Sequence, residues 1–571
     1  MSLTALAVSE DGGKVAYALS EAGSDWRTWR VRDVATGEDE PDLLRWSKFS
    51  GAAWTYDGHG FFYGAVEQPA PGAELTEETR APRILYHRLG TDQSVDRVEF
   101  AAADHPDWFP AAEVTPGGRY LVVTVARGTG TETALWVRDL TDPAGELVEL
   151  TAGFEAQDLV VAEIAEGFLV LTDRGAARGR LVLARRRGPG AAWAGPSEWE
   201  EVLAETADTL TEAHLYGGRL VCHYLRDARS VIKVHDLTGA PVREVQMPGM
   251  VSLVAGLSGR SVEGRSDSPT ILYQVVSFVQ SGAVWSHDLD SGDSRLVSPS
   301  AARFDADGYV TEQVFVTSGD GTRVPVFLTR RAEQQPDGQA RVLLYGYGGF
   351  SVPLTPTFSV TFAAWLDRGG VLAVANLRGG GEYGKAWHDA GRLDRKQNVF
   401  DDFAACARWL ADSGWSTPDR IAISGGSNGG LLVGASITQH PELFGAAVAE
   451  VAVLDMFRFH LFTIGWAWKS DYGDPEEAEH FEWLRAYSPL HNIAPGACYP
   501  PTLVMTGDHD DRVVPAHSYK FAAALQAAQG CDRPVLLRVS TSAGHGLGKP
   551  TSKLIDESTD RLAFLEATIG G

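Results

Sequence analysis

Short apolar and polar alternations, separated by turns, fill the first 315 residues. Four segments share one pattern, in which an apolar strand ends in Asp-Leu or Asp-Val before a turn that contains glycine. They are WRVRDVATG (29–37), LWVRDLTDPAG (135–145), IKVHDLTG (232–239) and VWSHDLDSG (284–292). ILYHRLGTD is a degraded copy without the aspartate, and RGRLVLARRR (178–187) lies in the middle of the longest gap between copies.

These copies are evenly spaced. The marker residues lie 55, 51, 97 and 52 positions apart, so the long gap holds two periods; they are Val34, Leu89, Leu140, Leu237 and Leu289. A period of about 50 residues with several short strands per unit predicts a β-propeller built from four-stranded blades. Six blades can be counted. Two stacked β-sandwiches are the alternative, but they would not need so even a period.

From about residue 316 the pattern changes to continuous apolar runs separated by helical stretches. The runs RVLLYGY, GVLAVANL, RIAISG, GAAVAEVAVL, PTLVMTG and PVLLRVS are typical of buried parallel strands. Phe403, Cys406, Ala407 and Leu410 are spaced to form one apolar helix face. We therefore predict an all-β propeller at 1–315 and a doubly wound, mostly parallel α/β-hydrolase domain at 316–571.

Charge and cysteine content narrow the possible partners and the compartment. The net charge of −25 makes nucleic acid and anionic membranes poor partners. No apolar run approaches the ~20 residues of a membrane helix, and MSLTALAVSEDGGKVAYALS lacks the features of a signal peptide. Four scattered cysteines without a C-x-x-C pair argue against a disulfide framework or a zinc site: Cys222, Cys406, Cys498 and Cys531. We expect a cytoplasmic protein in a reducing compartment.

Reactive residues gather where the predicted parallel strands end. GGSNGG places Ser427 in a G-x-S-x-G pattern, which is typical of a nucleophile elbow, although a tight turn would also need small residues. The run after PTLVMTG contains Asp508, Asp510 and Asp511, and the last strand leads to His545. A serine hydroxyl needs an imidazole to take its proton and a carboxylate to orient that imidazole. The order Ser–Asp–His therefore predicts an α/β-hydrolase triad, and spacing leaves the aspartate open.

YGYGGF, NLRGGGEYG, GGSNGGLL, TIGWAWKSDYG and DHDDRVVP together resemble the prolyl oligopeptidases. These are serine peptidases whose α/β-hydrolase domain is covered by a seven-bladed β-propeller. The resemblance extends over the C-terminal half, and over the propeller by its layout and by KFSGAAWTYDGHGFFY. It implies Ser427 as nucleophile, His545 as general acid–base and Asp510, two residues before Arg512, as the triad aspartate.

The resemblance also implies a site for a proline residue. Tyr347, through its hydroxyl, and Asn428, through its backbone N–H, would form the oxyanion hole, and Arg512 would donate to the substrate carbonyl one residue upstream of proline. A flat proline ring without an N–H suits an aromatic slot, although Trp468 and Tyr472 could also be core aromatics. The implied pocket residues are Phe350, Val453, Trp468, Tyr472 and Val513, with Ile464 and Ala467 touching the residue further upstream.

The predicted activity is hydrolysis of short peptides after proline by a monomer, through an acyl-enzyme and without metal or cofactor. Cleavage after Arg or Lys would need carboxylates in the pocket, and a dipeptidyl peptidase would need a glutamate pair. Peptide ligation or macrocyclisation could use the same acyl-enzyme, and a binding propeller on an inactive hydrolase is opposed by the complete triad. The helical segment and first blade that normally begin the family are not recognisable here, so we expect either a shortened chain or a missing start.

Overall fold

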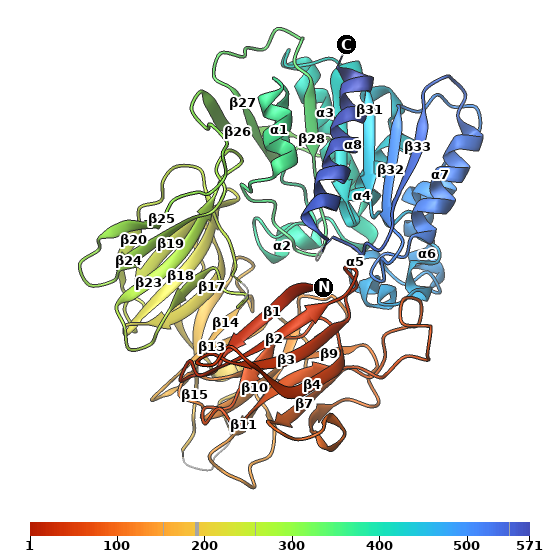
Figure 1. Ribbon diagram of the computed structural model, residues 1–571. Helices are drawn as coiled ribbons and strands as arrows, with labels where there is room; N and C mark the ends of the chain where they lie inside the picture. The colour runs from red at the N-terminus through yellow and green to blue at the C-terminus, as the bar shows by residue number, and fades with distance from the viewer. Residues whose placement is uncertain (152, 189–192, 257, 547–548, 571) are drawn as a thin grey trace.

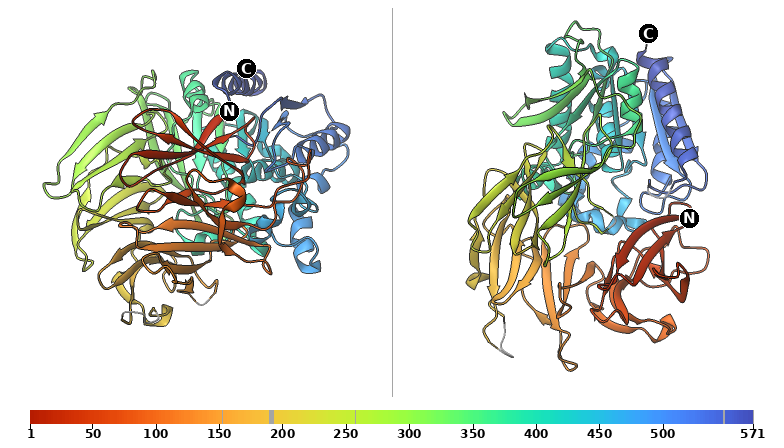
Figure 2. Two further views of the ribbon diagram at one scale, coloured as in Figure 1. Left: turned by 60° about the horizontal axis from the view of Figure 1, so that its bottom comes forward. Right: turned by 60° about the vertical axis from the view of Figure 1, so that its left-hand side comes forward.

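The computed structural model describes residues 1–571 except 152, 189–192, 257, 547–548 and 571. The N-terminal part consists of small β-sheets, and the C-terminal part consists of one large sheet between helices (Figure 1). The right-hand view of Figure 2 shows the hydrolase domain, coloured green to blue, above the sheets of the first domain. Among the described residues, no helix is long and apolar enough to cross a membrane.

Six antiparallel sheets follow one another in the described part of the first domain. The first three sheets contain β1 (Ser2–Val8), β2 (Lys14–Ser20), β3 (Arg27–Asp33) and β4 (Asp39–Ser47); β5 (Ala52–Trp54), β6 (Gly60–Ala65), β7 (Arg83–Arg88) and β8 (Arg97–Ala101); β9 (Trp108–Val114), β10 (Tyr120–Arg127), β11 (Thr133–Asp139) and β12 (Val148–Glu149). The next two contain β13 (Asp158–Ile164), β14 (Gly167–Thr172), β15 (Arg180–Arg185) and β16 (Glu200–Leu203); β17 (Thr209–Tyr216), β18 (Arg219–Arg226), β19 (Arg229–His235) and β20 (Pro241–Val245). The sixth contains β21 (Ser252–Leu253), β22 (Val262–Gly264), β23 (Thr270–Val276), β24 (Ala283–Asp288) and β25 (Ser294–Ser298).

The repeated sequence motif marks the third strand of each four-stranded blade. Its four copies coincide with β3, β11, β19 and β24, the degraded copy with β7, and the segment in the long gap with β15. The aspartate that ends the strand accepts a backbone N–H of the turn, as Asp33 does from Thr36 and Asp236 from Thr238. Successive sheets pack side by side, β1 beside β5 and β5 beside β9. The predicted propeller with six recognisable blades is confirmed.

The second domain is an eight-stranded sheet of order β26-β27-β29-β28-β30-β31-β32-β33. Neighbouring strands are parallel from β29 through to β33, and β26 and β27 are antiparallel. The strands are β26 (Tyr309–Thr317), β27 (Arg323–Arg331), β28 (Val342–Tyr345), β29 (Val371–Ala375), β30 (Ile421–Gly426), β31 (Ala446–Glu450), β32 (Thr502–Gly507) and β33 (Val535–Ser540). The sheet begins at Tyr309, so the predicted domain boundary at residue 315 falls inside β26.

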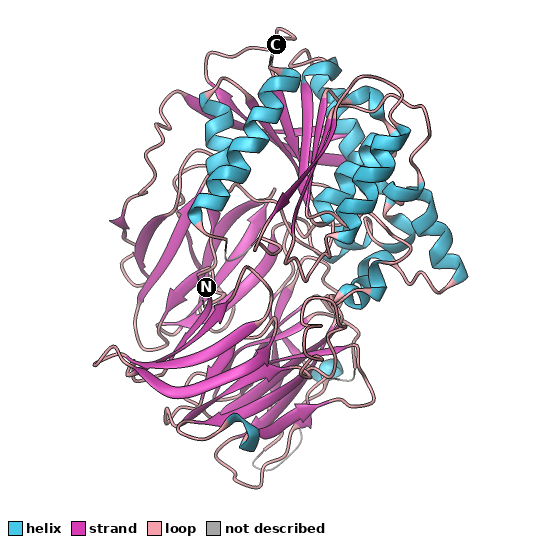
Figure 3. Cartoon of the chain, turned by 45° about the vertical axis from the view of Figure 1, so that its right-hand side comes forward, coloured by secondary structure: helices cyan, strands magenta, loops and turns pink. Residues whose placement is uncertain are grey.

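Helices cover both faces of this sheet (Figure 3). Apolar side chains of α1 and α8 pack on one face, and those of α3, α4 and α7 on the other. The predicted helix face is confirmed, since Phe403, Cys406, Ala407 and Leu410 are buried in α3. The helices are α1 (Val360–Asp367), α2 (Lys385–Asp389), α3 (Gln397–Asp412), α4 (Asn428–Gln439), α5 (Lys469–Tyr472), α6 (Ala478–Tyr487), α7 (Ala516–Ala528) and α8 (Thr551–Ile569).

Strand β33 differs from its prediction. PVLLRVS was expected to be a buried strand, but Leu536, Leu537 and Val539 are exposed. The strand lies at the edge of the sheet and pairs with β32 alone. An apolar run therefore predicted the strand correctly but did not predict its burial, because an edge strand is covered less than a central one.

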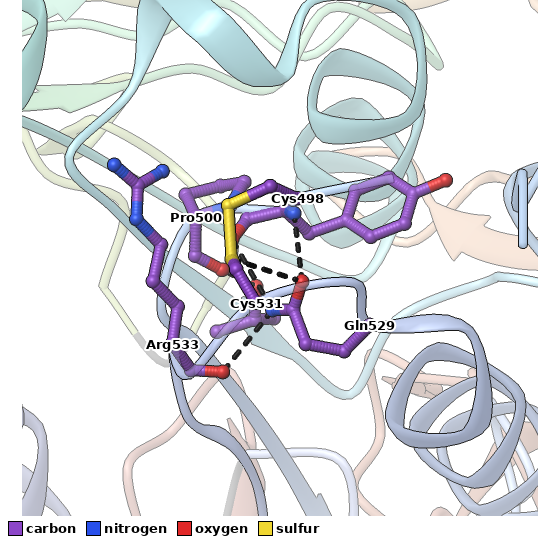
Figure 4. Close-up of a disulfide and its surroundings, with 7 residues drawn as sticks. Cys498, Pro500, Gln529, Cys531 and Arg533 are labelled. Carbon is purple, nitrogen blue, oxygen red and sulfur yellow. Dashed lines mark hydrogen bonds between the residues drawn. A yellow bond between two sulfur atoms is a disulfide. The ribbon is translucent and has the colours of Figure 1, made fainter. Parts of the chain in front are cut away.

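The cysteines were expected not to form a disulfide framework, but two of them, Cys498 and Cys531, are bonded to each other (Figure 4). Cys498 precedes β32, and Cys531 lies between α7 and β33. The two segments are also joined by hydrogen bonds from Gly530 N–H to the Ala497 carbonyl, at 2.8 Å, and from Tyr499 N–H to the Gln529 side chain, at 2.9 Å. Parallel pairing of β32 with β33 brings the starts of these strands together, which a spacing of 33 residues does not reveal. The other two cysteines are buried and free.

Candidate active site

Ser427 is the one residue between β30 and α4, at the carboxyl end of a parallel strand. Its φ of 58° and ψ of −119° are strained for any residue with a side chain. Two of the nearby glycines have no room for a side chain, whereas Gly426 has room for one. A Cβ on Gly425 would lie 2.3 Å from the carbonyl oxygen of Gly429, and one on Gly430 would lie 2.3 Å from the Cβ of Ala452. The segment therefore has the geometry of a nucleophile elbow rather than of an ordinary tight turn.

His545 and Asp510 are paired on the loops that follow β33 and β32. The Nδ1 atom of His545 lies 2.8 Å from one carboxylate oxygen of Asp510 and 3.1 Å from the other. Asp510 is buried and also accepts the backbone N–H groups of Arg512, at 3.1 Å, and Val513, at 2.9 Å. These bonds hold the carboxylate in place. With Nδ1 directed at Asp510, Nε2 is the ring nitrogen left for proton transfer.

The structure separates the three neighbouring aspartates that spacing could not distinguish. Asp508 is partly exposed and bonds to the adjacent histidine. Asp511 forms an ion pair with Lys48 of the propeller, at 2.7 Å, in which both side chains are buried. Within the described part of the chain, Asp510 is the one aspartate of the three that contacts His545.

The two predicted oxyanion donors lie beside Ser427. Asn428 is the first residue of α4, where backbone N–H groups have no acceptor within the helix. Tyr347 follows β28, which pairs with β30. Burial raises the pKa of Tyr347 to about 12, with a hydrogen bond to Ser427 opposing the shift. The phenol therefore stays protonated at neutral pH and can donate to an oxygen next to the serine.

The predicted pocket residues all lie in, or pack against, the large hydrophobic core on one face of the hydrolase sheet. Trp468 and Tyr472 lie at the ends of a 3₁₀ turn (Gly465–Trp468) and of α5, and the Phe350 and Tyr472 rings meet edge to face with centroids 5.3 Å apart. Phe459, which the sequence did not indicate, lies 5.3 Å from Tyr472 and 6.2 Å from Trp468 between ring centroids. The remaining predicted members of this cluster are Val453, Ile464, Ala467 and Val513.

Arg512 is already bound by the propeller. Its guanidinium donates to both carboxylate oxygens of Asp25, at 2.9 and 2.6 Å, and lies 5.5 Å from the ring centroid of Phe49. Asp25 lies between β2 and β3, and no sequence motif pointed to it. A substrate carbonyl that binds Arg512 must share the guanidinium with this carboxylate or displace it.

The same propeller segment touches the loops that carry Asp510 and His545. The N–H of Asp25 donates to Asp511 at 2.8 Å, next to Asp510. A Cβ on Gly544, next to His545, would lie 1.8 Å from the carbonyl oxygen of Gly23. Cavities of about 920 and 800 Å³ lie elsewhere, along β33 with α8 and beside α1, and neither is lined by a predicted site residue. The loops that carry Asp510, Arg512 and His545 therefore lie at the boundary between the two domains.

Comparisons with known proteins agree with this architecture. The model of the prolyl oligopeptidase N-terminal β-propeller domain matches residues 1–300, and that of the prolyl oligopeptidase family matches residues 356–571. The chain is 40% identical to a prolyl endopeptidase of Elizabethkingia miricola over 565 residues, which is 99% of this chain and 78% of the relative. It belongs to the prolyl oligopeptidase family. The predicted serine peptidase and its two-domain fold are thereby confirmed.

Other members of the family are also similar. Prolyl oligopeptidase A of Amanita bisporigera is 35% identical over 598 residues, which is 100% of this chain and 77% of the relative. A structure from a study of two prolyl endopeptidases and their inter-domain dynamics has a TM-score of 0.92 and 40% identity, covering 100% of this chain and 82% of that one.

Prolyl oligopeptidase B of Galerina marginata offers two forms for comparison. Its variant bound to a 35mer substrate has a TM-score of 0.92 at 29% identity, covering 100% of this chain and 81% of that one, whereas its apo form has a TM-score of 0.71 at 28% identity, covering 100% and 80%. Because both structures are of the same protein, the difference between the two TM-scores comes from its conformation. The domain arrangement here is similar to that of the substrate-bound form.

Proposed function

We propose that this family member cleaves short peptides on the carboxyl side of proline through an acyl-enzyme on Ser427. In this proposal His545 takes the serine proton at Nε2 while the serine oxygen attacks the proline carbonyl carbon. Asp510 orients the ring and stabilises the imidazolium. The oxyanion accepts hydrogen bonds from the Tyr347 hydroxyl and the Asn428 N–H. The imidazolium then protonates the leaving amine, and a water molecule repeats the sequence to release the peptide acid.

Two observations carry this proposal: the His545–Asp510 pair and the strained elbow of Ser427, each on a loop that follows a parallel strand of the same sheet. Specificity for proline is supported by the apolar and aromatic character of the cluster around Trp468 and Tyr472. A basic side chain would need a carboxylate there, and the implied pocket set contains none. Arg512 would hold the preceding carbonyl while it shares its donors with Asp25.

Two chromogenic peptides, one ending in Gly-Pro and one in Arg, test the proposal. We expect release of the chromophore from the Gly-Pro peptide, loss of this activity with a serine-directed inhibitor, and no release by Ser427→Ala. Preferred cleavage of the Arg peptide would refute the specificity. Full activity in Ser427→Ala would refute the assigned nucleophile.

Macrocyclisation is a second candidate activity. A protein named dual function macrocyclase-peptidase POPB from Galerina marginata is 33% identical over 594 residues, which is 98% of this chain and 78% of that relative. The same acyl-enzyme would form a ring if the peptide's own amine replaced water. Mass spectrometry separates the two outcomes, since a cyclic product is 18 Da (one water) lighter than the hydrolysed peptide. Hydrolysed product alone would remove this candidate.

The proposal extends to the oligomeric state, the peptide partners and the cellular compartment. We propose that the enzyme is a monomer that binds proline-containing peptides, which light scattering on the purified protein tests. The sequence predicted the cytoplasm from scattered cysteines, whereas the Cys498–Cys531 bond favours an oxidising compartment. Cell fractionation combined with thiol labelling decides between them. Four labelled thiols in the cytoplasmic fraction would support the first, and two labelled thiols outside the cytoplasm the second.

A further inference from the structure

A buried group of polar and charged side chains packs against the loop that carries Tyr347. Lys396 and Asp471 are 1% and 2% exposed, and the Lys396 ammonium lies 3.1 Å from one oxygen of the Asp471 carboxylate. The Nε2 atom of His388, which is also buried, lies 3.0 Å from the other oxygen. Removing such charges from water is costly, and replacing a buried ion pair by apolar residues is often neutral or stabilising. Fold stability alone therefore does not explain this cluster.

The cluster holds the backbone on the C-terminal side of Tyr347 at two points. The ammonium of Lys396 donates to the carbonyl of Gly348 at 3.0 Å, and the carboxylate of Asp471 accepts the N–H of Phe350 at 2.8 Å. Phe350 has a φ of 57°, a left-handed conformation that is costly for a residue with a bulky side chain. Local preferences would not select this loop shape, so it depends on these two bonds.

A second chain of hydrogen bonds links the same loop to the pocket and the elbow. The hydroxyl of Tyr472 donates to the Asn428 side chain at 3.0 Å, and the Asn428 amide donates to the Tyr347 carbonyl at 2.6 Å. Tyr472 follows Asp471 directly, and its ring centroid lies 5.2 Å from the Lys396 ammonium. Hydrogen bonds thus hold the backbone of this loop at the Tyr347 carbonyl, the Gly348 carbonyl and the Phe350 N–H.

We propose that Lys396, Asp471 and His388 are positioning residues for the peptidase reaction, and that they act by holding the Tyr347 hydroxyl at the oxyanion. The proposal rests on the role assigned to Tyr347 under the proposed function. An oxyanion donor is effective only when it lies about 2.7–3.1 Å from the developing charge. A small displacement of the loop removes that bond in the transition state and leaves the ground-state contacts of the substrate largely intact. The cluster therefore affects kcat more than KM.

The charge of the carboxylate is maintained within the cluster. Burial alone would raise the pKa of Asp471, but the Lys396 ammonium, His388 and the Phe350 N–H outweigh it and hold the pKa below its usual value. The nitrogen of His388 that faces away from Asp471 has no hydrogen-bond partner in the described structure. The described structure thus gives the imidazole ring of His388 one hydrogen bond, to the Asp471 carboxylate, which fits a role in holding that carboxylate in place.

A double-mutant cycle between Lys396→Met and Tyr347→Phe tests the inference. Lys396→Met keeps the length of the side chain and removes the ammonium. We expect it to lower kcat on a Gly-Pro substrate about 10–100-fold with KM changed less than threefold, and Tyr347→Phe to lower kcat about 10²–10³-fold. In the Tyr347→Phe background, Lys396→Met should cost no further activity, because the donor it positions is already gone.

A matched control removes another ion-paired lysine. Lys520→Met breaks a pair with the buried Asp455, which makes no hydrogen bond to the Tyr347 loop in the described part of the chain, and should keep kcat within threefold. If Lys396→Met does not fold, Asp471→Asn replaces it in the same cycle. It keeps an oxygen for the Phe350 N–H and loses the charge, so we expect a 3–10-fold loss of kcat that also vanishes without the Tyr347 hydroxyl.

The outcomes distinguish this inference from the proposed function. Multiplicative losses in the double variant, or an unchanged kcat in folded Lys396→Met, would overturn the positioning role while Tyr347→Phe still confirms the oxyanion donor. A fully active Tyr347→Phe would overturn both the donor role and this inference. The activity of Ser427→Ala would then still test the peptidase assignment independently.

Discussion

The Cys498–Cys531 bond should make a large part of the hydrolase domain's stability sensitive to reductant. It closes a loop of 33 residues that contains β32, α7 and the triad residue Asp510. The chain-entropy relation gives about 12.5 cal/mol/K for a loop of this length, or about 4 kcal/mol at 25 °C. For a domain of the size of 309–571, the unfolding entropy is about 0.55 kcal/mol/K, so the Tm should fall by about 7 °C on reduction.

The measurement is thermal unfolding with and without reductant, for the wild type and for the Cys498→Ser/Cys531→Ser variant. Reductant should lower the wild-type transition to that of the variant, and the variant should not respond to reductant. Cys222 and Cys406 are buried and free, so they serve as an internal control for any effect of the reductant on thiols. Four reactive thiols in the unreduced, unfolded protein, or a wild-type transition that ignores reductant, would refute the reasoning.

Three further predictions concern the site. Ser427→Ala should lower kcat about a millionfold with an unchanged unfolding transition, since triad members act as one unit; substantial residual turnover of the same substrate would exclude the serine mechanism. Asp510→Asn should lower kcat about 10⁴-fold and Asp511→Asn much less, because the second carboxylate pairs with Lys48 instead of the imidazole; the reverse order in a kcat comparison would contradict the assignment. Trp468→Ala should reduce the ratio of kcat/KM for proline over alanine substrates by about 10-fold or more, through lost aromatic contact; an unchanged ratio would make it a core residue.

The sequence by itself determined the features that arise within a short stretch of chain. The propeller was predictable because four of the six blades repeat one local requirement, an apolar strand followed by an aspartate that caps its turn, as at Asp33 and Asp236. The elbow was predictable because the tight strand-to-helix turn leaves no room for side chains at Gly425 and Gly430, which fixes glycine at both positions in the sequence. The parallel sheet was predictable because buried central strands need continuous apolar runs.

Only the tertiary structure decided which distant residues meet. It placed Asp510 against His545, paired Asp511 with Lys48, and gave Arg512 a partner in Asp25. It also paired two cysteines that look unrelated in sequence and left the apolar strand β33 exposed at the sheet edge.

The cluster of Lys396, Asp471 and His388, which bonds to the loop of Tyr347, was also decided by the tertiary structure, since its members come from separate segments of the hydrolase domain. Such contacts depend on how strands and domains pack against each other, and that packing brings together side chains separated by tens to hundreds of residues. Their spacing along the chain is therefore not constrained by any helical or strand period, and no local pattern can record them.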